Sequence, residues 1–141
     1  MPAPLHALLY RSAATGPMGP DQFLPLLTQS MRANAVRGVT GRLFISEADE
    51  APAQFVQWIE GDPADVGILF ERIRTDPRHT DLDVLASGPI SDLVGRPGRL
   101  YPDWSMSLER RPDLPVTLAQ FLRVYQDRPE PVAAPRWGLA A

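Results

Sequence analysis

Residues 39–75 decide the fold, and they read VTGRLFISEADEAPAQFVQWIEGDPADVGILFERIRT. Two apolar runs, 39–45 and 54–60, flank a polar loop that contains a proline, which is the pattern of a β-hairpin. Asp62 and Pro63 then suit the N-cap and the first position of a helix. Apolar residues recur along this helix at a period of 3.6, and Asp76-Pro77 ends it near residue 75. The segment therefore predicts a hairpin followed by an amphipathic helix.

Further elements extend this unit in both directions along the chain of 141 residues, a length typical of one domain. We expect a buried strand over 5–10, a helix over 21–34, a fourth strand beginning at 82–85, a turn-rich connection over 88–98, a fifth strand within 103–108, an amphipathic helix over 114–126 and a loosely ordered tail over 128–141. The order β-α-β-β-α-β-β predicts an α+β protein, a ferredoxin-like sandwich with two helices on one sheet face and an additional C-terminal helix.

Composition excludes several kinds of site. There is no cysteine and no lysine, and the chain has 2 histidines, so disulfides, thiolate or histidine-rich metal sites and lysine chemistry are not expected. The net charge of -3 offers no electrostatic reason to bind nucleic acid or an anionic membrane. Neither a leader peptide nor a stretch of ~20 apolar residues is evident. We therefore expect a cytoplasmic protein that contacts neither membrane nor nucleic acid.

Polar residues interrupt several buried patterns, at positions where an unpaired polar group costs roughly 1–3 kcal/mol. They are Tyr10 and Ser12 on the face of Leu8, Gln57 between Phe55 and Ile59, and Ser30 and Asn34 on the apolar stripe of the first helix. If both strand faces look toward the helices, these side chains converge. Together they offer hydrogen-bond donors and acceptors without an obvious acid or base, which suits a flat heteroaromatic ligand.

Each of these residues also has an ordinary structural explanation. Tyr10 fits a half-buried tyrosine, Asn34 fits a helix C-cap, and Gln57 could bond a neighbouring backbone group. No nucleophile elbow, phosphate-binding loop or dinucleotide motif is present, so an enzyme is not expected. Glu60, Asp62 and Asp65 form an acidic cluster, but helix capping explains the two aspartates.

Five segments recur in the order and spacing of one family: 10–12, 34–44, 55–61, 76–79 and 99–106. Through them the chain resembles BLUF domains, which are flavin-binding sensors of blue light. The resemblance implies FAD (or FMN) held between the two helices, with Asn34 at the ring's C4 carbonyl and N3 edge. It places Gln57 between the flavin and Tyr10, and Ser12 and Ser30 beside the ring. Asp76, Arg78 and His79 are expected near the far ring edge, the ribityl chain and the phosphate.

The resemblance also implies photochemistry, in which Tyr10 gives up an electron and a proton, and Gln57 relays the proton and ends rotated or tautomerised. Trp104 and Met106 share a strand face, and which of them faces the flavin stays open, with core packing as the alternative for both.

We expect residues 1–108 to form the sensor and 109–141 a C-terminal helix and tail, since the roughly 33 residues after the sensor are too few for an enzymatic domain. Output is then expected through contact with a second copy, as a homo-oligomer, or with an unidentified downstream protein. The C-terminal helix should pack on the sheet face that bears Val56 and Trp58, or on a partner subunit. The alternative function is a flavin-binding interaction module without photochemistry.

Overall fold

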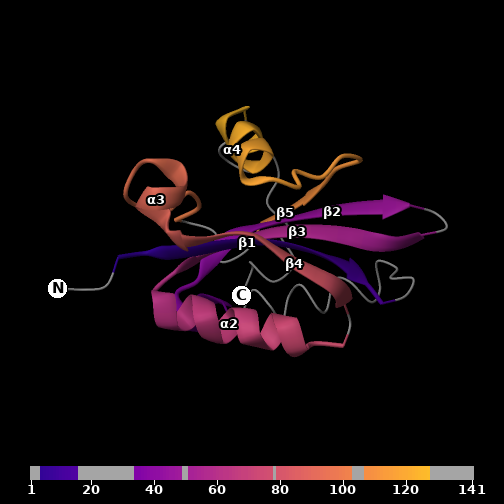
Figure 1. The fold of residues 1–141 in the computed structure, drawn as a ribbon, viewed down its shortest axis with the longest axis horizontal. Coiled ribbons are helices and arrows are strands. Elements are labelled where there is room, and N and C mark those ends of the chain that lie inside the picture. Colours follow the sequence, from indigo (N-terminus) through magenta and orange to yellow (C-terminus); the bar gives the residue numbers. More distant parts are fainter. Residues whose placement is uncertain (1–3, 16–33, 49–50, 78, 103–106, 128–141) are drawn as a thin grey trace.

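A five-stranded sheet forms the centre of the molecule, with its strands in the order β4-β1-β3-β2-β5. The computed structural model describes residues 4–15, 34–48, 51–77, 79–102 and 107–127. Its elements are β1 (His6–Ala14), β2 (Thr40–Ala48), β3 (Ala51–Gly61), α2 (Pro63–Thr75), β4 (His79–Pro89), α3 (Ile90–Val94), β5 (Ser107–Arg110) and α4 (Leu118–Asp127). The β2–β5 pair is parallel and the other pairs are antiparallel. This is the predicted α+β, ferredoxin-like architecture (Figure 1).

The β2–β3 hairpin and α2 confirm the prediction made from residues 39–75. A Cβ atom on Gly41 would lie 1.9 Å from the carbonyl oxygen of Trp58, so only glycine allows β2 to approach β3 this closely. Asp62 caps α2 as expected, accepting a hydrogen bond of 3.0 Å from the amide of Ala64.

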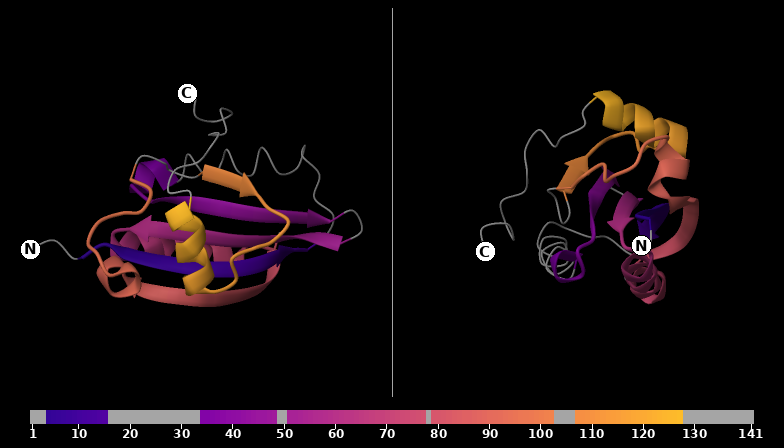
Figure 2. Two further views of the ribbon diagram at one scale, coloured as in Figure 1. Left: turned by 90° about the horizontal axis from the view of Figure 1, so that it is seen from above. Right: turned by 90° about the vertical axis from the view of Figure 1, so that its left-hand side faces the viewer.

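The two faces of the sheet carry separate cores, because successive side chains of a strand point to opposite faces. The α2 face is built from Leu8, Tyr10, Val39, Leu43, Ile45, Phe55, Ile59, Val66 and Leu69. The opposite face is built from Leu9, Phe44, Val56, Trp58, Ile90, Leu100, Tyr101 and Phe121. Figures 1 and 2 show α2 on one side of the sheet and both α3 and α4 on the other.

The C-terminal helix packs on the chain's own sheet, which decides between the two placements expected from the sequence. Phe121 of α4 is fully buried and stacks on Trp58, with ring centroids 4.9 Å apart and ring planes 14° apart. The helix begins at Leu118, four residues later than expected, because the hydroxyl of Thr117 accepts a hydrogen bond of 3.1 Å from the amide of Gln120.

Other differences from the sequence prediction concern the ends of elements and one additional helix. The fourth strand is longer than expected and extends from His79 to Pro89. The expected turn-rich connection contains the helix α3, whose C-cap is Gly95 in a left-handed conformation with φ 76°. Five residues are too few to show a helical period, so the prediction of a plain connection was wrong there. The expected helix over 21–34 lies outside the described residues, except for Asn34. No helix in the described ranges has the length and apolar character required to cross a membrane.

Candidate functional site

Tyr10 and Gln57 form a buried pair at the middle of the sheet. They are register partners on β1 and β3, so their side chains leave the same face, toward α2. The hydroxyl of Tyr10 donates a hydrogen bond to Oε1 of Gln57, and the two residues are 4% and 7% exposed. The structure therefore gives the Gln57 amide oxygen a side-chain partner, where the sequence also allowed a backbone one.

The surroundings of Tyr10 keep its phenol protonated. Its ring packs against Phe70 of α2, with centroids 6.1 Å apart. Burial, and secondarily the charge of Asp76, raises the pKa of the Tyr10 phenol well above its ordinary value. The group is therefore a neutral hydrogen-bond donor at physiological pH, and it releases its proton less readily than an exposed tyrosine does.

Ser12 supplies a second polar group on the same face of β1, two residues beyond Tyr10. It is 3% exposed, and its hydroxyl oxygen has no hydrogen-bond partner among the residues that the structure describes. A buried hydroxyl in this condition is unfavourable unless something else completes its hydrogen bonds. Ser12 is therefore a candidate to contact a polar ligand edge on this face.

Asn34 is buried, and it does not cap the helix that contains it. Residues 34–37 are helical, and the backbone turns at Gly38, whose φ is 69°. The backbone carbonyl of Asn34 accepts a hydrogen bond of 2.9 Å from the amide of Val39. The residue as a whole is 1% exposed, so its side-chain amide is buried. Gly38 takes the left-handed position that ends such helices, so capping does not explain the amide of Asn34.

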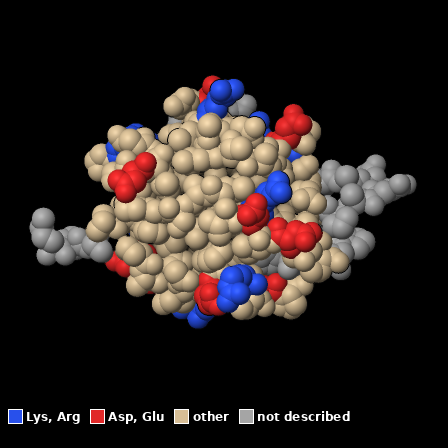
Figure 3. Space-filling model, in the orientation of Figure 1, with Lys and Arg blue, Asp and Glu red and all other residues tan. Residues whose placement is uncertain are grey.

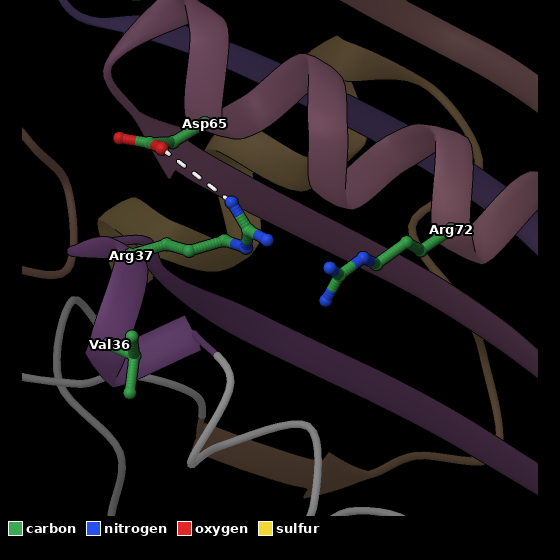
Figure 4. A pocket seen from close by; sticks show the side chains of 4 residues that line it. All are labelled: Val36, Arg37, Asp65 and Arg72. Atoms are coloured by element: carbon green, nitrogen blue, oxygen red, sulfur yellow. Dashed lines mark ion pairs between the residues drawn. The ribbon is translucent and has the colours of Figure 1, made fainter.

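A cavity of about 440 Å³ opens beside these helical residues and is lined by Val36, Arg37, Asp65 and Arg72. Figure 4 shows Arg37 and Arg72 reaching toward the same opening, Arg37 from the helical residues 34–37 and Arg72 from α2. One nitrogen of Arg37 lies 4.0 Å from a carboxylate oxygen of Asp65. Two guanidinium groups at one opening suit a carbonyl or phosphate oxygen of a ligand.

Sequence analysis did not identify Arg37 or Arg72 as site residues. Arg37 lies three positions after Asn34, so a helical continuation past residue 34 would have placed both on one side of the helix. Among arginines spread along the whole chain, neither carries a signal of its own.

The remaining predicted site residues are described in part. Asp76 is the C-cap of α2, with its backbone N–H bonded to the carbonyl of Ile73, and it acts electrostatically on Tyr10. His79 begins β4 and pairs with Ala14, but its side chain is not described. Ser30, Arg78, Trp104 and Met106 lie outside the described residues.

The described groups fit a flavin ring. A flat ring with carbonyls and ring nitrogens requires both donors and acceptors at its edge, and the buried amides of Asn34 and Gln57 offer both. The unpartnered hydroxyl of Ser12 adds a further donor or acceptor, while Phe70 and the apolar side chains of α2 exclude water. The fold and the site thus define a small α+β domain with a site suited to a planar ligand with a polar edge.

Comparison with known families and structures identifies this class. The sequence profile of the family described as sensors of blue-light using FAD (BLUF) matches residues 5–107. The chain therefore belongs to the BLUF family of flavin-binding blue-light sensors.

Individual relatives agree with this assignment. The chain is 33% identical over 129 residues to the photoactivated adenylate cyclase subunit beta of Euglena longa, covering 86% of this chain and 14% of that protein. It is 34% identical over 104 residues to the corresponding subunit of Euglena gracilis, covering 73% of this chain and 11% of that protein. The dark-state structure of BlrB, a BLUF protein, superposes with a TM-score of 0.66 at 30% identity, covering 93% of this chain and 91% of that one. The chain thus spans a small part of the cyclase subunits and nearly all of BlrB.

Proposed function

We propose that Tyr10 and Gln57 are the light-switched pair of this sensor, and their buried hydrogen bond is the observation that carries the proposal. A bound flavin supplies the absorption of blue light and an acceptor for one electron. The chain's own residues supply the donor and the proton path. Tyr10 meets both needs, because a phenol is oxidisable and burial keeps this one protonated.

Gln57 is the residue of this site that can adopt two states. With its Oε1 accepting from Tyr10, its NH2 group is directed as a donor to the opposite side. Tyr10 would give up an electron to the bound flavin and a proton that Gln57 relays, and both would then return to Tyr10. The amide of Gln57 would be left rotated or tautomerised, so that its donor and acceptor exchange places. The hydrogen bonding at the ligand edge then differs although the backbone fold is the same, which is the basis of a reversible spectral shift.

The other buried polar groups hold the ring. Ser12 is assigned to its polar edge because it is buried two residues beyond Tyr10 on the same face of β1, and Asn34 because it is a buried amide in the helical residues 34–37. Arg37 and Arg72 are assigned to a carbonyl or phosphate oxygen of the ligand, because they converge on the cavity between the helical residues 34–37 and α2. Two guanidinium groups suit a phosphate, which both FAD and FMN carry. FAD is the proposed flavin because the family is described as using it, with FMN as the alternative. Asp76 acts on Tyr10 through its charge.

Roles for Ser30, Arg78, His79, Trp104 and Met106 stay predictions from the family resemblance.

Output is proposed to be a change in protein contacts, not catalysis. The relatives named as adenylate cyclases match this chain over 11–14% of their length, so the comparison concerns their sensor region. We assign residues 1–108 to the sensor and 109–141 to the output, with a second copy or a downstream protein in the cytoplasm as the partner. On the face shown in Figure 3, the described acidic and basic side chains are interspersed, which gives no single-sign field for nucleic acid.

Absorption spectra before and after blue light test the proposal. A flavin spectrum that shifts slightly to the red under light and returns in darkness is the expected result. A flavin spectrum that does not respond would favour a binding module without photochemistry. Chromatography of the released flavin then identifies FAD or FMN.

A further inference from the structure

Glu60 is a buried carboxylate whose two oxygens accept four hydrogen bonds. Its side chain is 0% exposed. Oε1 accepts from the indole N–H of Trp58 at 2.7 Å and from the amide of Leu100 at 2.9 Å. Oε2 accepts from the amide of Tyr101 at 2.7 Å and from the hydroxyl of Thr40 at 3.1 Å. This residue therefore joins β3 to β2 and to the segment that follows α3.

The residues that Glu60 holds are the ones on which α4 rests. Phe121 stacks on Trp58 and makes an edge contact with Tyr101 at 6.4 Å between centroids. Tyr125 makes an edge contact with Tyr101 at 5.4 Å, and its hydroxyl donates to the carbonyl of Leu100 at 3.3 Å. Because Phe121 is the one buried residue of α4, these contacts are the main attachment of that helix.

Glu60 also lies on the strand that carries Gln57. Trp58 and Glu60 point to the α4 face of β3, and Gln57 points to the α2 face. β3 lies between β1 and β2 and is bonded on both edges, and Gln57 and Trp58 are consecutive residues of this strand. The backbone of β3 is therefore the shortest route between Gln57 on one face and Trp58 and Glu60 on the other.

We propose that Glu60 is a positioning residue that transmits the rearrangement of Gln57 to α4, an inference that rests on the proposed function. In the dark, its carboxylate holds Leu100 and Tyr101 against β3, and they hold α4. When Gln57 rearranges, the neighbouring Trp58 shifts and its bond to Glu60 weakens, which loosens the two amide bonds and the seat of α4. Hydrogen bonds to a buried charge are strong and directional, so small displacements at the carboxylate change them appreciably.

The amides of Leu100 and Tyr101 report directly on this contact, so the test is their hydrogen exchange in the flavin-bound protein, in darkness and under continuous blue light. We expect exchange of both amides, and of α4, to become several-fold faster under light.

Trp58→Phe removes the indole N–H and keeps an aromatic ring against Phe121. Thr40→Val is the control from β2, since it also removes one hydrogen bond to Glu60, together with the bond that Thr40 accepts from Arg99. The wild type, Trp58→Phe and Thr40→Val are all expected to show the flavin red shift. Light-dependent exchange of the two amides is expected only in the wild type and in Thr40→Val.

Glu60→Gln provides a second variant of nearly equal size, in which one acceptor oxygen becomes a donor facing N–H groups. It is expected to keep the red shift and to lose the light-dependent exchange of both amides. A purely structural role for Glu60 predicts faster exchange in darkness for every variant, with the light-minus-dark difference retained, and that result would overturn the inference.

Two further outcomes separate this inference from the proposed function. A wild-type red shift without any light-dependent exchange at Leu100 and Tyr101 would overturn the role of Glu60 and leave the photochemistry standing. Absence of the red shift in the flavin-bound wild type would overturn both.

Discussion

The two faces of β3 bury polar groups in different ways. On the α4 face, all the polar partners of the Glu60 carboxylate are supplied by the chain itself. On the α2 face, the hydroxyl of Ser12 is buried without a partner in the described part of the chain, and a cavity opens between the helical residues 34–37 and α2. A polar group that is satisfied internally stabilises the fold, whereas one that is not indicates where a ligand binds.

Tyr101 is an informative exception on the α4 face. Its hydroxyl has no hydrogen-bond partner among the described residues, yet the residue is 1% exposed. The ring makes the contacts instead: the guanidinium carbon of Arg42 lies 5.0 Å from its centroid, and Phe121 and Tyr125 pack against its edges. A buried polar atom indicates a ligand site only where the rest of the side chain does not already explain the burial.

The largest effect on stability is expected for Glu60→Ala. The change leaves the indole of Trp58 and the amides of Leu100 and Tyr101 without their acceptor, so we expect a loss of about 3–5 kcal/mol in the free energy of unfolding. Urea denaturation measures this, with Glu71→Ala on the exposed side of α2 as the control that leaves stability unchanged. Equal stability of the two variants would contradict the structural role of the α4 face.

Phe121→Ala removes the buried anchor of α4. A truncation of a buried aromatic ring costs about 3–5 kcal/mol, and we expect a loss in this range by denaturation. Flavin content should be retained, because the lost contact lies on the opposite face from Tyr10 and Gln57. Leu122→Ala, at a half-buried neighbour, serves as the control with a smaller loss. Depletion of flavin in Phe121→Ala would mean that the two faces are not independent in binding.

Asn34→Ala tests the α2 face through binding. Loss of one hydrogen-bond partner at a buried ring edge costs about 1–3 kcal/mol, which is roughly a ten- to hundredfold weaker affinity for flavin. Fluorescence titration of the apoprotein with FAD gives the dissociation constant. Asp92→Ala, at an exposed position of α3 on the opposite sheet face, should bind as the wild type does. Undiminished affinity in Asn34→Ala would remove this residue from the site.

The smallest effect is expected for Tyr101→Phe. Because the hydroxyl makes no hydrogen bond within the described structure, its removal should change the free energy of unfolding by less than about 1 kcal/mol and should not lower it. Thermal or urea denaturation against the wild type measures the change. A clear loss of stability would show that the hydroxyl has a partner in solution.

Sequence patterns predicted the strands and α2 well because both depend on local periodicity. Gln57 was identifiable for the same reason, as an amide at a position where period two requires an apolar residue. Its pairing with Tyr10 was not predictable from residues alone, since the register of β1 and β3 is a property of the assembled sheet.

Residues whose roles come from distant segments were missed. Glu60 was identified only as a member of an acidic cluster with Asp62 and Asp65, because its partners Leu100 and Tyr101 lie about forty residues later and contact it only in the fold. Arg37 and Arg72 were missed because each is an ordinary surface arginine until residues 34–37 and α2 come together. α3 was missed because five residues carry no periodic signal.

The light response of Tyr10→Phe and Gln57→Leu tests the central claim most directly. Phenylalanine keeps the shape of Tyr10 without its oxidisable hydroxyl, and leucine keeps the bulk of Gln57 without its donor and acceptor. Both variants should purify with flavin and show no reversible red shift after blue light, and the double variant should be no worse than either, because one pair carries the response. A normal red shift in either single variant would contradict the account, and loss of flavin itself would reassign the pair to binding.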